Sequence, residues 1–181
     1  MIIAIIGESA GGKSSIADYI SEWYDFKKVV TCTTRPKREY ETDGVDYYFI
    51  SDEAFLDLEN SDYFAETASY NGWKYGSAKT EYVGNKVVVL TPRGLRSIRR
   101  NGIKDIFSVY LDVPRRDRMK KSLDRGDDIE EIYRRSLSDV GQFDGVEDEV
   151  DLVISNPGYA KRIDEVAKSI MGFATMSITH D

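Results

Sequence analysis

The sequence predicts a three-layer α/β fold in which helices cover both faces of a parallel β-sheet. Short apolar runs recur along the chain, and between them apolar residues take the spacing of helix faces. Strands separated by helices in this way form a parallel sheet, because its crossover connections are helical. The expected strands are Met1–Ile6, Val29–Thr31, Lys86–Leu90, Asp105–Leu111 and Leu152–Ser155.

The first strand is a continuous apolar run that ends at Gly7, a pattern typical of a strand buried on both faces. The next segment predicts a helix over residues 14–24, since its apolar residues recur every three or four positions. These residues are Ile16, Ala17, Ile20 and Trp23. Further helices are expected at residues 92–100, after Pro114, and at about residues 159–170.

Composition and charge restrict the possible functions. The 181 residues carry a net charge of −7, which argues against nucleic-acid binding because phosphate contacts need a basic face. The single cysteine, Cys32, excludes an intrachain disulfide and suits a reducing compartment. The only histidine, His180, lies near the C-terminus, so a histidine base or zinc site is not expected. No run is long enough to span a membrane, and we expect a cytoplasmic protein for which no protein partner is implied.

Between the second and third strands the pattern changes to short, aromatic-rich strands. We interpret residues 33–82 as a lobe inserted into a core of about residues 1–32 and 83–181, the whole forming one domain. The expected lobe strands are Tyr47–Ile50, Phe64–Tyr70 and Trp73–Tyr75, with a helix near Asp52–Glu59. A polar interruption from Arg125 to Glu131 lies between two helices and predicts a short lid at about residues 125–135.

The segment Gly7-Glu8-Ser9-Ala10-Gly11-Gly12-Lys13-Ser14 matches the phosphate-binding pattern G-x-x-x-x-G-K-[ST] between an apolar strand and a helix. It predicts the P-loop NTPase fold: glycines let the backbone N–H groups point at phosphate oxygens, aided by the helix N-terminus. Lys13 is expected to reach the β- and γ-phosphates of ATP, and Ser14 to bind Mg²⁺. The expected ATP contacts here are Gly7, Ser9, Gly11, Gly12, Lys13, Ser14 and Ser15.

A second cluster places Arg35 and Arg38 close together in a loop. Two planar guanidinium groups suit a doubly charged monophosphate, and Tyr47 and Tyr75 add hydroxyl donors at the tips of short strands. Taken alone, the same cluster also fits a solvated basic loop on the surface.

Three stretches follow one another in the order and spacing of one family. They are the P-loop, Thr33-Thr34-Arg35 with Arg38, Glu41, Gly44 and Asp46-Tyr47, and Glu66 with Tyr75-Gly76-Ser77. In these residues the sequence resembles the guanylate kinase family, over roughly residues 1–170. The resemblance implies that Arg35, Arg38, Tyr47 and Tyr75 bind the phosphate of an acceptor nucleotide, and that Thr31, Glu66 and Ser77 bind its base.

The chemistry of these side chains agrees with a guanine base. An ionised Glu66 can accept hydrogen bonds from N1–H and the exocyclic amino group, and Thr31 can donate to O6. Adenine would leave the carboxylate unpaired, which gives strong discrimination. The resemblance therefore implies transfer of the γ-phosphoryl group of ATP, with Mg²⁺, to GMP or dGMP.

The resemblance continues into the expected lid, at Asp124-Arg125-Gly126, Ile129-Glu130-Glu131 and Arg134-Arg135, with one residue fewer than the family has between Gly126 and the arginine pair. It implies that Arg125 and Arg135 stabilise charge on the donor phosphates. Because Arg134 and Arg135 are adjacent on a helix, only one of them is expected to face the site. Asn156 stands where the family places residues near the adenine of ATP.

One stretch departs from the family. Two acidic residues usually precede a glycine at the end of the third strand, whereas this chain has Val89-Leu90-Thr91-Pro92-Arg93-Gly94. The acceptor pocket or the handling of metal could be altered, or Thr91 could compensate. Kinases of another deoxynucleotide or of a ribose bisphosphate remain alternatives. A non-catalytic interaction module of the same fold is a further one, although such modules typically lose the P-loop that is intact here.

Overall fold

The computed structural model describes residues 1–39, 41–70 and 72–178, so His180 lies outside the described part of the chain. Its centre is a sheet in the order β2-β7-β1-β8-β9, in which each neighbouring pair is parallel. The strands are β1 (Ile2–Ile6), β2 (Lys27–Lys28), β7 (Lys86–Leu90), β8 (Ile106–Asp112) and β9 (Leu152–Ser155). The prediction of an α/β fold around a parallel sheet is confirmed.

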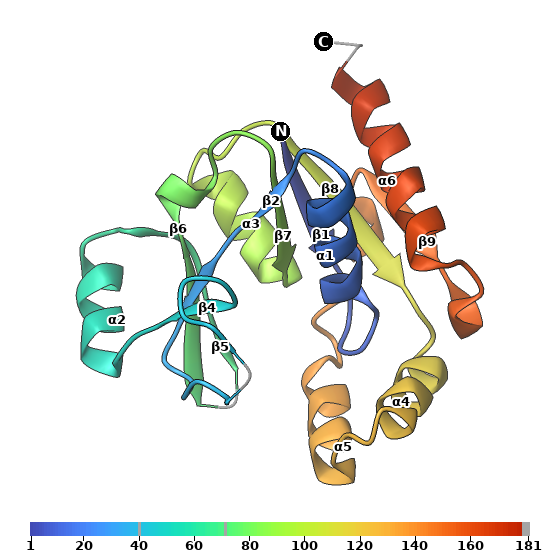
Figure 1. The fold of residues 1–181 in the computed structure, drawn as a ribbon, viewed down its shortest axis with the longest axis horizontal. Helices are drawn as coiled ribbons and strands as arrows, with labels where there is room; N and C mark the ends of the chain where they lie inside the picture. Colours follow the sequence, from blue (N-terminus) through green and yellow to red (C-terminus); the bar gives the residue numbers. More distant parts are fainter. Residues whose placement is uncertain (40, 71, 179–181) are drawn as a thin grey trace.

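Helices cover both faces of this sheet (Figure 1). On one face, α1 (Lys13–Trp23) and α6 (Ile163–Ile178) pack against residues that include Ile3 and Ile5. On the other face, α3 (Pro92–Arg100) packs against residues that include Ala4. Successive residues of β1 therefore enter opposite layers of the core, and burial of each large aliphatic side chain contributes about 1.5–3 kcal/mol. Because β1 is held on both faces, the position of the loop that follows it is fixed at its first residue.

The remaining core helices lie at the carboxyl ends of the strands, below the sheet in Figure 1. They are α4 (Arg115–Asp124) and α5 (Ile129–Ser138), which pack on each other. Asp128 caps α5 by accepting the Glu131 N–H at 2.9 Å, so the polar interruption between the two helices is only residues 125–128. Among the described residues, no helix combines the length and the apolar character needed to cross a lipid bilayer.

Short 3₁₀ helices connect several of these elements. They are η1 (Lys79–Glu81), η2 (Val146–Asp148) and η3 (Pro157–Tyr159). The last of these corrects the prediction of a helix from about residue 159 to 170. The chain instead makes a 3₁₀ turn there and then forms the longer α6, which begins at Ile163.

A second sheet forms the lobe to the left of the core in Figure 1, in the order β4-β3-β6-β5. Its elements are β3 (Thr31–Thr33), β4 (Tyr47–Phe49), α2 (Asp52–Asn60), β5 (Phe64–Tyr70) and β6 (Trp73–Ala78). Phe55 of α2 stacks on Phe64 at a ring-centroid distance of 4.6 Å and packs with Cys32, which gives the lobe a small core. Asn101 at the end of α3 donates to the Ala65 carbonyl oxygen at 2.7 Å and joins the lobe to the main core.

The predicted strand Val29–Thr31 of the parallel sheet was wrong in position. The strand that pairs with β7 is Lys27–Lys28, and Thr31–Thr33 belongs to the lobe sheet instead. Both lysines are exposed, since β2 is an edge strand and edge strands are often protected by charge. A strand of two lysines has no apolar residues to mark it. The apolar pattern therefore predicted the strand at the next β-branched residues along the chain.

Candidate active site

Glycines shape the loop that joins β1 to α1. Gly12, the N-cap of α1, has a φ of 90°, in the left-handed region that favours glycine. A Cβ at Gly7 would lie 3.0 Å from the Leu111 carbonyl oxygen, and one at Gly11 would lie 3.0 Å from that of Glu8. Side chains are therefore excluded from these positions, and the backbone takes the compact form that a phosphate cradle needs.

Lys13 is the first residue of α1, and its side chain points back to this loop. Its Nζ donates a hydrogen bond to the Glu8 carbonyl oxygen at 2.8 Å. Burial lowers the pKa of Lys13 to about 8, and the carboxylates of Asp139 and Glu8 oppose that shift. The ammonium therefore stays charged at neutral pH, as contact with phosphate oxygens requires.

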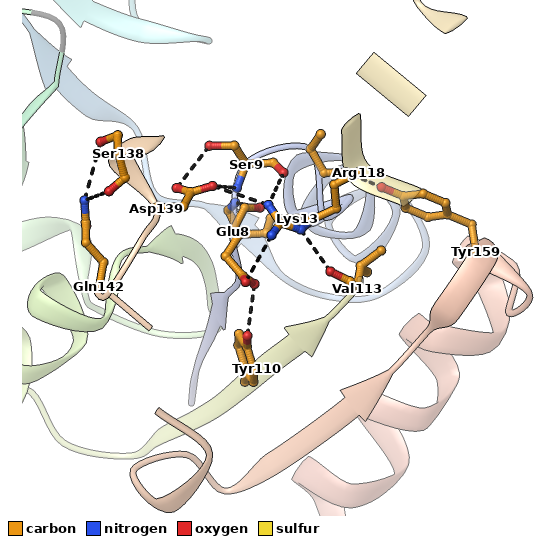
Figure 2. A network of polar contacts seen from close by, with 11 residues as sticks. Glu8, Ser9, Lys13, Tyr110, Val113, Arg118, Ser138, Asp139, Gln142 and Tyr159 are labelled. Atoms are coloured by element: carbon orange, nitrogen blue, oxygen red, sulfur yellow. Dashed lines mark hydrogen bonds and ion pairs between the residues drawn. The ribbon is translucent and has the colours of Figure 1, made fainter. Parts of the chain in front are cut away.

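A polar network holds the loop from the side of α4 and α5 (Figure 2). The buried Arg118 donates to Glu8 Oε1 and to the Ser9 carbonyl oxygen, each at 3.2 Å. Asp139 accepts the Ser9 N–H at 2.8 Å and the Ser9 hydroxyl at 3.2 Å. Tyr110 of β8 donates to Glu8 Oε2 at 2.9 Å. The sequence did not predict this network, because Arg118 lies in a charged run that is typical of a solvated helix.

A cleft of about 400 Å³ opens beside the P-loop. It is formed by three segments that are distant in sequence: the P-loop, the lobe and α5. Its lining residues are Ser9, Ala10, Lys13, Ser14, Arg35, Arg38, Glu41, Tyr47, Trp73, Tyr75, Glu131 and Arg135. The fold thus places the expected phosphate cradle and the expected acceptor arginines in one space, of a volume that suits small-molecule ligands.

On the lobe side, a buried ion pair fixes the first arginine. Arg35 Nη2 donates to Glu41 Oε1 at 2.6 Å, and both side chains are 8% exposed. This bond lowers the pKa of Glu41 and raises that of Arg35, so both groups are charged. The Arg35 guanidinium carbon also lies 5.4 Å from the ring centre of Tyr47, whose ring packs edge-on to that of Tyr75. Glu41 also accepts the Arg38 N–H at 2.8 Å, so one carboxylate arranges the whole loop.

Deeper in the lobe, Glu66 lies 94% buried, since 6% of its surface is exposed. Ser77 donates to Glu66 Oε1 at 2.7 Å, and the Tyr82 hydroxyl lies 2.7 Å from the same Ser77 oxygen. Burial raises the pKa of Glu66, and the bonds from Ser77 oppose that shift. A Cβ at Gly94 of α3 would lie 3.4 Å from Glu66 Oε2, so glycine leaves room around this carboxylate. Thr31 begins β3 and is half-buried.

The expected lid arginines differ in position. Arg135 lines the cleft and donates to Glu131 Oε1 at 2.6 Å. Arg134 bonds the other oxygen of Glu131 and, like Arg125, is outside the set of described residues that line the cleft. Arg125 pairs with Asp127 in the turn before α5.

Other expected contacts are also outside that set of described lining residues: Gly7, Gly11, Gly12, Ser15 and Asn156 for ATP, and Thr31, Glu66 and Ser77 for the base. Ser15 is exposed on α1. The Asn156 side chain is 8% exposed and bonds the backbone of Lys161 through both its oxygen and its nitrogen.

The guanylate kinase family matches residues 1–172 of this chain. The chain belongs to the guanylate kinase family. A guanylate kinase of Symbiobacterium thermophilum is 32% identical over 179 residues, which cover 94% of this chain and 84% of the relative. The crystal structure of guanylate kinase from Anaplasma phagocytophilum has a TM-score of 0.71 at 21% identity, over 98% of this chain and 85% of that one. The YorR protein of Bacillus subtilis, solved with phosphorylated GDP, has a TM-score of 0.55 at 18% identity, over 100% of this chain and 99% of that one.

This guanylate kinase family member is a nucleoside-monophosphate kinase with the P-loop NTPase fold. The departure at the end of β7 has a structural consequence. The Thr91 hydroxyl accepts the Gly94 N–H at 3.1 Å and caps α3, while Val89 is 37% exposed. The Thr91 hydroxyl therefore caps a helix. One of its acceptor positions is used for that bond and is not free to take the place of a family carboxylate.

The kinase also has two residues beside the P-loop that the sequence did not indicate. The Tyr159 hydroxyl donates to the Ala10 carbonyl oxygen at 2.7 Å. Lys121 Nζ lies 3.9 Å from the centre of the Tyr159 ring and 3.9 Å from the place of a Cβ on Gly12. Lys121 thus adds a cation next to the loop, but it lies in the same charged run as Arg118 and carries no separate sequence signal.

Lys13→Ala is expected to lower turnover by on the order of a hundredfold or more, because loss of one preorganised charge contact in transfer typically costs that much. The fold should persist, as β1 and α1 are held by apolar packing. A coupled ATP-consumption assay measures the rate, and thermal unfolding checks the fold. Lys120→Ala, an exposed lysine on α4, is the matched control and should keep wild-type turnover. If the Lys13 variant keeps more than half of wild-type activity, the loop is not the phosphate site.

Proposed function

We propose that this kinase transfers the γ-phosphoryl group of ATP to GMP or dGMP and so forms the diphosphate. The observation that supports this most directly is the buried Glu66, which accepts a hydrogen bond from Ser77 inside the lobe. A buried carboxylate is costly unless it is paired or hydrogen-bonded. Guanine supplies two adjacent donors, N1–H and the exocyclic amino group, that can complete its bonding.

The acceptor phosphate is proposed to bind at Arg35, Arg38, Tyr47 and Tyr75, all of which line the cleft. Glu41 accepts a hydrogen bond from one nitrogen of the Arg35 guanidinium, so this group is oriented before the nucleotide arrives. Thr31 is proposed to donate to guanine O6, and Ser77 to read the base through its bond to Glu66.

The transfer step needs alignment more than acid–base chemistry. An oxygen of the acceptor phosphate forms a bond to the γ-phosphorus while the bond from that phosphorus to the β-phosphate oxygen breaks, and ADP leaves. Lys13 is proposed to stabilise the charge on the transferring group from the P-loop side, and Arg135 from the α5 side. We propose Arg125 as a further lid cation, and Gly7, Ser9, Gly11 and Gly12 with Ser14, Ser15 and Asn156 as the rest of the ATP site. Because the Ser9 N–H and hydroxyl are bonded to Asp139, Ser9 is proposed to shape the loop rather than to donate to phosphate.

The P-loop also fits a metal–nucleotide substrate, because its glycines exclude side chains from the cradle and Ser14 lines the cleft beside Lys13. Mg²⁺ bound with ATP neutralises phosphate charge. Ser14 would hold it through the hydroxyl. In the described residues no group of three or more His, Cys, Asp or Glu side chains is arranged to bind a metal by itself. We also propose a cytoplasmic location, since Cys32 is a buried free thiol.

The acceptor assignment predicts a ranking of substrates. With ATP and Mg²⁺, GMP or dGMP should be phosphorylated at least about tenfold better in kcat/KM than AMP, CMP or dTMP, because only guanine matches the donor and acceptor pattern of Thr31 and Glu66. A coupled assay against this panel, with ribose 1,5-bisphosphate added, gives the ranking. Preferred turnover of a pyrimidine nucleotide or of the sugar phosphate would contradict the guanine assignment and leave the kinase class in place.

The acceptor-phosphate assignment predicts a selective change in KM. Arg38→Ala should raise KM for the acceptor about tenfold or more, with a much smaller change in KM for ATP, because a charge-assisted bond to phosphate is lost. Arg35→Lys tests the other arginine without leaving Glu41 as an unpaired buried charge. It should also raise KM for the acceptor, because lysine lacks the planar guanidinium group. Lys37→Ala in the same loop is the control. Equal rises for both substrates would assign these arginines a general structural role.

Glu66→Gln separates recognition from stability. The amide keeps an acceptor for Ser77 but places a donor against a guanine donor, so the preference for GMP over AMP should shrink. Because burial raises the pKa of Glu66, its ionised form costs stability at neutral pH, and stability increases as the pH falls through that raised pKa. The variant should therefore unfold at a higher temperature than wild type at pH 7, and the difference should shrink on acidification. An unchanged base preference would remove Glu66 from the base site.

A further inference from the structure

The end of α5 is attached directly to the phosphate loop. Asp139 follows the last helical residue, and its two carboxylate oxygens accept the Ser9 N–H at 2.8 Å and the Ser9 hydroxyl at 3.2 Å. Figure 2 shows this carboxylate between the loop and the chain that leaves α5. The side chain is 14% exposed, so water competes little for these bonds.

Arg118 of α4 completes the attachment. Its Nη1 donates to the Ser9 carbonyl oxygen at 3.2 Å and lies 3.4 Å from Asp139 Oδ2, while its Nε donates to the Val113 carbonyl oxygen at 2.9 Å. The N–H, carbonyl and hydroxyl groups of Ser9 are thus all bonded to α4 or to the end of α5. Both helices therefore bond the same P-loop residue, Ser9, and α4 also bonds Glu8.

Arg135 lies one helical turn before this attachment. Residues four apart share a face of an α-helix, so Arg135 and Asp139 are on the same side of α5. Arg135 lines the cleft, whereas Arg134, about 100° around the helix, is not among the described lining residues. Glu131, one further turn back, bonds Arg135 Nε at 2.6 Å. The contact at Ser9 therefore limits how far the Arg135 side chain can be from the phosphate cradle.

We propose that Asp139 is a positioning residue, which anchors the base of α5 on Ser9 and thereby holds Arg135 at the donor phosphates. The proposal rests on the proposed phosphoryl transfer for the role of Arg135. It explains why Arg135 and not Arg134 faces the cleft. Glu131 and Asp139 then have complementary roles. Glu131 holds the guanidinium group of Arg135, and Asp139 holds the helix that carries Arg135.

A double-mutant cycle tests this proposal with the acceptor that wild type uses best. Asp139→Ala should lower kcat about tenfold or more, since a small misplacement of a catalytic group can cost up to a hundredfold. In an Arg135→Ala background the same change should lower kcat less than about twofold, because coupled residues are not additive. Asp139→Asn, which keeps an acceptor for Ser9 N–H, should lie between wild type and the alanine variant. Glu130→Gln, an exposed carboxylate on α5, is the control.

Amide hydrogen exchange gives a readout that does not depend on the acceptor. Asp139→Ala should speed exchange in residues 129–139, and Glu130→Gln should leave it unchanged. Multiplicative losses of kcat in the cycle would overturn the proposal and indicate that Asp139 acts on the P-loop alone. A faster Asp139→Ala enzyme would also overturn it and would indicate that the carboxylate competes with phosphate for Ser9. Failure of GMP as a substrate contradicts the proposed acceptor without affecting the exchange result.

Discussion

The phosphate loop is held by two carboxylates and two cations, and the rest of the site depends on their balance. Arg118 bonds the carboxylates of Glu8 and Asp139, which also act on the charge of Lys13, and burial of any one of these charges without a partner would cost several kcal/mol. Arg118 donates from all three of its nitrogens, to carboxylates and to backbone carbonyls. The loop is thus fixed before any nucleotide is present, so the proposed phosphate site would not need to reorganise its dipoles when charge enters.

The proposed acceptor side is ordered in the same way, by the pair of Glu41 and Arg35. Glu41 neutralises Arg35 and also orders the backbone at Arg38, so that two cations are presented from a loop that would otherwise be flexible and repelled by its own charge. Each side therefore uses carboxylates to orient a buried arginine: Glu41 for Arg35, and Glu8 with Asp139 for Arg118. The two sides are joined through the core, because Asn101 of α3 bonds β5 of the lobe at Ala65.

Apolar periodicity was enough to predict the parallel sheet, and the P-loop could be placed because its pattern combines glycines with a strand and a helix. The predictions failed at segments whose residues are mainly charged. β2 consists of Lys27 and Lys28 and has no apolar pattern, so its strand was placed too late in the chain. Arg118 and Asp139 were missed for a related reason: a charged residue in a helix has the same sequence pattern whether it is solvated or buried in an ion network. Only the packing of α4 and α5 on the P-loop distinguishes the two cases.

The sequence at the end of β7 affects where negative charge lies around the proposed donor site. Val89 and Thr91 carry none, and the Thr91 hydroxyl caps α3. Among the described residues, the carboxylates that raise the pKa of Lys13 are those of Asp139 and Glu8, on the side of α5 and β8. A carboxylate on β7 would be fixed in the sheet, whereas Asp139 belongs to a helix pair that is attached to the P-loop through Ser9 and Glu8. In this kinase the field at Lys13 therefore depends on the position of α5, which links the charge of the donor site to the element that carries Arg135.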